Sequence, residues 1–165
     1  MTGRPDIEAP RHTALVHDYM TQRGGAERVA GLLARAMPDA GLFTSVHDRS
    51  EVPLDFIGGR RWQTSYLQPL AGRLPLKLML PLLPSAVASL DTDRFELLIS
   101  SSSAFGHHAR KAEGALHVCY CCTPPRFLWQ RQDYFRERPA LAAGLSPLLA
   151  LLARLDLQAA SRVDS

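Results

Sequence analysis

Apolar and polar positions along the chain form blocks that predict strands and helices in alternation. The short apolar run TALVH, at 13–17, is rich in strand formers and precedes a polar turn with two glycines. The next segment, 26–37, places its apolar residues at helical spacing and stops at Pro38. A strand, a glycine turn and a helix in this order predict the first unit of a βαβ fold.

Four more strands and two more helical regions are predicted downstream. The strands cover residues 41–48, 60–67, 95–103 and 115–121. The strand predicted at 95–103 contains a continuous apolar run, which is typical of a strand buried on both faces. Residues 74–90 are predicted to be helical but broken by prolines, and 145–160 to be a long helix with an apolar stripe. This alternation predicts an α/β fold, with a Rossmann-like parallel sheet covered by helices on both faces, in one domain over 1–165.

Composition and charge narrow the class of protein. The chain is 46% hydrophobic, which is typical of a folded domain and not of a disordered one. Its net charge is +3, and its positive charge comes almost entirely from arginine, which suits phosphate groups. No basic run predicts a nucleic-acid partner. The amino terminus lacks the apolar core of a signal peptide, and the apolar run at 78–90 is short for a membrane span. We therefore expect a cytoplasmic location with reduced cysteines.

Polar clusters follow three of the predicted strands, at 17–25, 100–103 and 122–126. Because the carboxyl ends of parallel strands meet at one edge of a sheet, we expect these clusters to border a common ligand site. Gly24 and Gly25 could present backbone N–H groups to a diphosphate, or they could form a plain tight turn. The patterns GxGxxG and GxxxxGK[ST] are absent, which argues against a standard dinucleotide site or P-loop.

Neither the three cysteines nor the histidine pair His107-His108 predicts a metal site. Cys119 and Cys122 have CxxC spacing, but zinc needs a second ligand pair, and the sequence has none at usable spacing. Strand alternation puts Cys119 and Cys121 on one face, where we interpret them as small buried hydrophobes, and puts Cys122 at the strand end. His107 and His108 are interpreted as solvated surface residues, because no cysteine or carboxylate lies near them at ligand spacing.

Several segments in order resemble a known enzyme family. HDYMTQRGGAERV, FELLISSSSAFG, HVCYCCTPPRFLW and SRVD occur at spacings that resemble the amino-terminal half of a family-4 glycosyltransferase, a retaining enzyme of the GT-B fold. The nearest subgroup is the bacterial mannosyltransferase-like proteins of polysaccharide and lipopolysaccharide assembly. The GGAE turn and the CYC-x-TP-x-R-x-LW segment are the most specific parts. The resemblance extends from about Ala14 to Asp164.

The resemblance implies the activity and the partners. Such enzymes transfer a sugar from a nucleotide-sugar donor to a glycan or lipid-linked acceptor with retention, and they need no metal or other cofactor. This chain would be the acceptor-side domain, ending at the junction to an absent carboxyl-terminal donor-binding domain, so we expect it to be inactive alone. Many relatives act on lipid-linked acceptors. We therefore expect weak peripheral contact with a membrane surface through Arg73, Lys77 and the leucines between them.

The resemblance also implies roles for individual residues. Cys122 stands where the family usually has a histidine beside the transferred sugar, and a thiol is a poorer hydrogen-bond donor than an imidazole. Glu27 could favour the helix N-terminus electrostatically, which we prefer, or could bind an acceptor hydroxyl. The expected donor- and acceptor-binding residues are Gly24, Gly25, Ser101, Ser102, Thr123 and Arg126.

Two other interpretations stay open. The chain could be an inactive remnant or a binding module without turnover, which Cys122 favours. It could also be an unrelated Rossmann-like nucleotide-binding domain, which the missing GxGxxG pattern disfavours.

Overall fold

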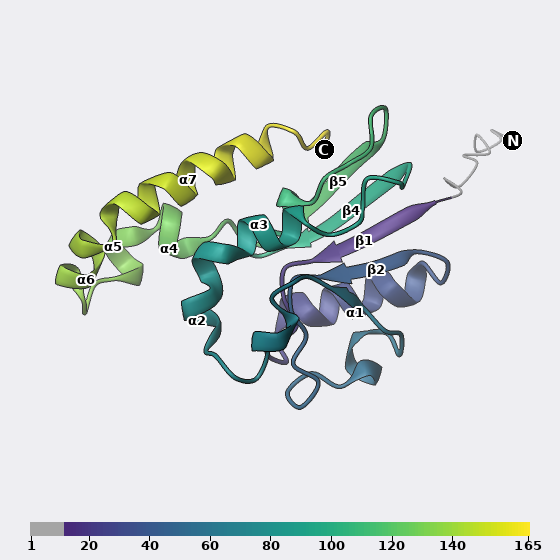
Figure 1. Cartoon of the computed structure of the whole chain (residues 1–165), viewed down its shortest axis with the longest axis horizontal. Coiled ribbons are helices and arrows are strands. Elements are labelled where there is room, and N and C mark those ends of the chain that lie inside the picture. Colours follow the sequence, from purple (N-terminus) through teal and green to yellow (C-terminus); the bar gives the residue numbers. More distant parts are fainter. Residues whose placement is uncertain (1–11) are drawn as a thin grey trace, which may run out of the picture.

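Five parallel strands form the centre of the structure, a computed structural model that describes residues 12–165 (Figure 1). The strands are β1 (Thr13–His17), β2 (Gly41–Thr44), β3 (Gln63–Thr64), β4 (Leu97–Ser102) and β5 (Leu116–Cys121). Their order in the sheet is β3-β2-β1-β4-β5. The predicted α/β fold with a Rossmann-like parallel sheet is confirmed. Because the chain moves outward in opposite directions from β1 and β4, the sheet has a topological switch point between these two strands.

Helices of very different length surround the sheet. The α-helices are α1 (Gly25–Ala36), α2 (Leu76–Met79), α3 (Leu83–Ala88), α4 (Arg126–Trp129), α5 (Arg131–Tyr134), α6 (Pro139–Gly144) and α7 (Ser146–Ala160). Short 3-10 turns are η1 (Leu54–Ile57), η2 (Gln68–Leu70), η3 (Leu80–Leu82) and η4 (Gly106–His108). Among the described residues, no helix combines the length and the apolarity that a membrane crossing requires.

The two faces of the sheet pack against different helices. Leu15 of β1 belongs to a buried cluster with Ala30 of α1, on one face. Its neighbours Ala14 and Val16 belong to a second cluster with Val87 of α3, on the other face. Alternate side chains of a strand point to opposite faces, so an apolar β1 is buried on both sides. The prediction of helices on both faces is thereby confirmed.

Two predicted strands are shorter in the structure than the sequence suggested. β2 ends at Thr44, because the chain turns there and Ser45 donates its backbone N–H to Asp18 O at 3.1 Å. β3 is reduced to two residues, Gln63 and Thr64. Apolar residues beyond these ends, such as Val46 and Leu67, still enter the core from loops. Apolar patterning alone therefore overstated the length of both strands.

The cysteines of β5 are more exposed than predicted. Cys119 is half-buried and Cys121 is exposed, because β5 is the edge strand of the sheet and its carboxyl end extends beyond the packed core. The end of the chain lies along β5: Asp164 N donates to His117 O at 2.9 Å, and Cys119 N donates to Ser165 O at 2.7 Å. The interpretation of Cys119 and Cys121 as small buried hydrophobes was wrong.

Candidate functional site

A pocket of about 320 Å³ opens at the carboxyl edge of the sheet. The segments after three strands line it: Tyr19 and Gly24 follow β1, Ser103 follows β4, and Arg126 follows β5, while Lys77 comes from α2. It therefore lies at the switch point between β1 and β4, where open α/β sheets bind ligands. We call it the switch-point pocket.

The switch-point pocket brings together part of the predicted binding set. Gly24, Gly25, Thr123 and Arg126 all line it, although they come from two distant parts of the chain. Gly24 is the N-cap residue that precedes α1; its backbone is extended, and it has no side chain to cap the helix. The first amides of α1 thus lie beside the pocket, where they can donate to an anion.

Three predicted residues lie outside this pocket. Ser101 is fully buried in β4, and its backbone oxygen is 2.8 Å from Nδ1 of His17. Ser102 is also buried and hydrogen-bonds within the protein. Cys122 is exposed, and its backbone N–H donates to Ser102 O at 2.8 Å. Desolvation, and next the negative charge of Asp18, raise the pKa of the Cys122 thiol, so this residue is not an activated thiolate nucleophile.

Glu27 lines the pocket with a carboxyl group that is buried but unpaired. The residue is 2% exposed, and its Oε2 atom has no hydrogen-bond partner. This atom therefore accepts no hydrogen bond from the first amides of α1. A methyl group added at Gly24 would collide with Glu27 Oε2, whereas one at Gly25 would meet open space. The two glycines therefore differ: Gly24 makes room for the carboxyl group, and Gly25 leaves the rim of the pocket open.

Tyr19 adds a hydroxyl group beside this carboxyl group. Burial, and then the negative charges of Asp18 and Glu27, raise the pKa of Tyr19 to about 12. The phenol therefore keeps its proton at neutral pH and can donate a hydrogen bond. Arg126 and Lys77 are exposed cations on the pocket lining. The pocket thus offers a buried acceptor, a neutral hydroxyl and cations, a set suited to a ligand with hydroxyl and phosphate groups.

Sequence reasoning missed the residue that shapes the loop beside the pocket. Asp18, which follows β1 directly, is 1% exposed. Its carboxylate accepts the backbone N–H groups of four consecutive residues in the loop after β4, Ser103, Ala104, Phe105 and Gly106. The only sequence signal was an acidic residue directly after a buried strand, a position where an unpaired charge would be costly.

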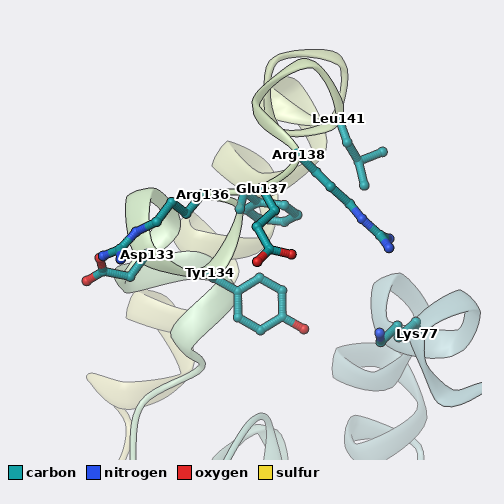
Figure 2. A pocket seen from close by; sticks show the side chains of 8 residues that line it. Lys77, Asp133, Tyr134, Arg136, Glu137, Arg138 and Leu141 are labelled. Carbon is teal, nitrogen blue, oxygen red and sulfur yellow. The ribbon is translucent and has the colours of Figure 1, made fainter.

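Two further hollows adjoin the switch-point pocket and share Lys77 and Tyr134 with it. One, of about 580 Å³, has a charged lining; Figure 2 shows Lys77 across the opening from Tyr134, Glu137 and Arg138. The other is an apolar groove of about 390 Å³ between η3 and α7. Its apolar lining is Leu78, Leu80, Pro81, Phe127, Phe135, Leu141, Leu145, Leu148, Leu149 and Leu152.

Comparisons with protein-family models, with curated proteins and with solved structures found no match. The resemblance to family-4 glycosyltransferases therefore stays a prediction from sequence motifs. The fold itself is established by the parallel sheet and its strand order.

Proposed function

We propose that this chain is the acceptor-side domain of a retaining glycosyltransferase that moves a sugar from a nucleotide sugar to a lipid-linked or glycan acceptor. The observation that carries the proposal is the switch-point pocket. It gathers Gly24, Gly25, Thr123 and Arg126, which the sequence motifs had marked, around the unpaired carboxyl group of Glu27. A buried polar atom without a partner is costly in a folded protein, and a ligand hydroxyl would supply the missing hydrogen bond.

The groups in the pocket suit both substrates of such a reaction, the hydroxyl of the acceptor and the phosphates of the donor. The carboxyl group of Glu27 can accept a hydrogen bond from an acceptor hydroxyl, and the protonated phenol of Tyr19 can donate one. The N-terminus of α1 and the guanidinium of Arg126 favour phosphate oxygens. These groups would bind and orient the substrates. Closure of a donor-binding domain over the pocket would then exclude water.

The adjoining apolar groove favours a lipid-linked acceptor over a free glycan. It begins at Lys77 and Tyr134, where the switch-point pocket ends, so a single amphipathic molecule could occupy both. Leu78 at its edge is 65% exposed, and Leu74 and Leu82 of the same segment are also exposed. Exposed leucines next to cations are typical of segments that contact a membrane surface.

A binding module without turnover is the second candidate. It is favoured by Cys122, which replaces the histidine expected from the resemblance, lies outside the pocket, and carries a protonated thiol. A cysteine there offers a much weaker hydrogen bond to a sugar than imidazole does. Both candidates predict that the pocket binds the acceptor.

The test combines binding and transfer. The chain is titrated with a polyprenyl-phosphate-linked sugar in detergent, and a fusion with the donor-binding domain of a family-4 transferase after Ser165 is assayed with radiolabelled nucleotide sugars. We expect acceptor binding by the chain, transfer by the fusion, and more transfer with Cys122→His. Glu27→Gln should lower acceptor affinity at least tenfold, which equals about 1.4 kcal/mol. The exposed Glu51→Gln is the matched control.

Each outcome separates the two candidates or rejects both. Acceptor binding without transfer, even by the Cys122→His fusion, would support a binding module. Glu27→Gln and Glu51→Gln with equal acceptor affinities would contradict the role of the pocket. If neither protein binds any acceptor or nucleotide sugar, the glycosyltransferase proposal is wrong.

A further inference from the structure

A cluster of two histidines and an aspartate lies apart from the switch-point pocket. His107 and His108 of η4 direct their Nε2 atoms at one oxygen of Asp156 in α7, with Nε2–Oδ1 distances of 3.0 Å and 3.8 Å. The three side chains are buried, with exposures of 9%, 8% and 7%. Neither Nε2 atom has a hydrogen-bond partner, and Oδ1 has none. All three ligand atoms lie within 4.8 Å of one another.

The hydrogen bonds of Ser102 identify the tautomer of His107. The Ser102 hydroxyl donates its one proton to Asp18 Oδ1 at 3.2 Å, since a carboxylate can only accept. The same oxygen accepts Gly106 N–H at 3.1 Å. Nδ1 of His107, 3.2 Å from this oxygen, must therefore be the donor and carry a proton. In neutral His107 the lone pair is then on Nε2, which faces Asp156.

A cation between the imidazoles and the carboxylate would satisfy all three of these atoms. A lone pair and a carboxylate oxygen at 3.0 Å repel each other unless a positive charge lies between them. A proton could satisfy His107 alone, but it would leave the Nε2 of His108 buried and unpaired beside the same oxygen. A metal ion accepts a lone pair from all three atoms at once.

The distances agree with such an ion. Ligand atoms at about 2.0–2.1 Å from a tetrahedral zinc lie about 3.3 Å apart. The two His–Asp distances, 3.0 Å and 3.8 Å, bracket this separation, and the two histidine atoms lie within 4.8 Å of each other, so side-chain movements would complete the geometry. We propose that His107, His108 and Asp156 form a binding site for a divalent transition metal such as zinc.

The surroundings of the cluster fit a metal site. Trp129 Nε1 donates to the other oxygen of Asp156, Oδ2, at 2.8 Å, which orients the carboxylate with Oδ1 toward the histidines. Ser102 orients His107 in the same way. Outer hydrogen bonds of this kind are typical of metal ligands in proteins.

A hollow of about 330 Å³ reaches the cluster and is bordered by His107, Trp129 and Asp156. It gives an ion a path to the site and leaves the fourth coordination position to water or a small ligand. Because the ligands come from η4 and α7, a bound ion would also fasten the last helix to the sheet. Cys119 and Cys121 border the same hollow, so the test must separate nitrogen and oxygen ligands from thiols.

The experiment uses the full chain after removal of metal with a chelator. Zinc affinity is measured by competition with a chromophoric chelator, and the ligand type is read from the visible and near-ultraviolet spectrum of bound Co²⁺. We expect one ion per chain and a cobalt spectrum without a thiolate charge-transfer band. Asp156→Asn and His108→Gln should each weaken zinc binding more than tenfold, and Trp129→Phe about tenfold. A double Cys119→Ser, Cys121→Ser variant should bind zinc as the wild type does.

Several results would overturn the site. The proposal is wrong if zinc does not bind stoichiometrically or if bound cobalt shows a strong thiolate band. It is also wrong if zinc binding is lost in the cysteine double variant or in a variant of the exposed His12. Unfolding of Asp156→Asn would not block the test, because the wild-type cobalt spectrum alone distinguishes imidazole and carboxylate from thiolate.

Discussion

Replacing Asp18 with asparagine tests whether one buried carboxylate holds the loop beside the switch-point pocket. Its Oδ2 atom accepts hydrogen bonds from the backbone N–H groups of Ser103 and Ala104, with N–O distances of 2.5 Å and 3.0 Å. Its Oδ1 atom accepts Phe105 N at 2.8 Å and also the N–H of Gly106. Four consecutive amides therefore point at a single anion, an arrangement that stabilises negative charge.

The expected loss follows from counting these donors. Asparagine keeps one oxygen, but its amide nitrogen is itself a donor and must face two of the four backbone N–H groups. Those two groups lose their acceptor while they stay buried, at a cost of about 1–3 kcal/mol each. Asp18→Asn should therefore lower the free energy of unfolding by about 2–6 kcal/mol, a large part of the about 5–15 kcal/mol of an ordinary domain.

The assay is urea denaturation followed by circular dichroism, with Asp48→Asn as the control. Asp48 also accepts a backbone N–H and a hydroxyl, both from Ser50, but at the protein surface. Its substitution should cost less than about 1 kcal/mol. Equal losses in the two variants, or a loss below about 1 kcal/mol for Asp18→Asn, would refute the role given to the buried carboxylate.

Three further predictions use matched changes. Gly24→Ala should lower the free energy of unfolding by up to about 1 kcal/mol, because its methyl group must displace the end of the buried Glu27 side chain, whereas Gly25→Ala, which meets open space, should not destabilise; equal urea midpoints would contradict this. Burial lowers the pKa of His117 to about 4, so the unfolded chain takes up a proton near pH 6.5 that the folded chain refuses. Stability should be full above pH 6.5 and fall by up to about 3 kcal/mol as the pH drops to 4, and His117→Gln should flatten this slope in urea titrations. Leu78→Ser should weaken flotation with anionic vesicles at low salt more than Leu157→Ser, a change at a similarly exposed leucine of α7; no flotation by the wild type would contradict the proposed membrane contact.

The fold was predictable because strand and helix patterns repeat along the chain. The run 13–17 and the helical spacing after Gly25 gave the first strand and helix almost to the residue. The short helices between Arg126 and Gly144 were not predicted, since four to six residues carry too little periodicity. The lengths of β2 and β3 were overstated, because loops can bury apolar side chains as well as strands do.

The candidate site was predictable in position but not in detail. Polar clusters after parallel strands meet at one edge for geometric reasons, and Gly24, Thr123 and Arg126 accordingly share a pocket. Sequence could not show that Glu27 is unpaired, because that depends on how the turn folds over it. The interpretation of His107 and His108 as solvated was wrong, because both side chains are buried against Asp156. Asp156 lies on a helix far along the chain, and no local spacing indicates that contact.

The serine run at the end of β4 shows why a motif can mark a site without contacting the ligand. Ser102 was expected to bind substrate, yet its hydroxyl joins His107 to the carboxylate of Asp18 within the protein. Asp18 in turn holds Ser103 and Ala104, which do line the switch-point pocket. The run therefore acts on the pocket through the backbone, by placing the loop that forms one of its walls.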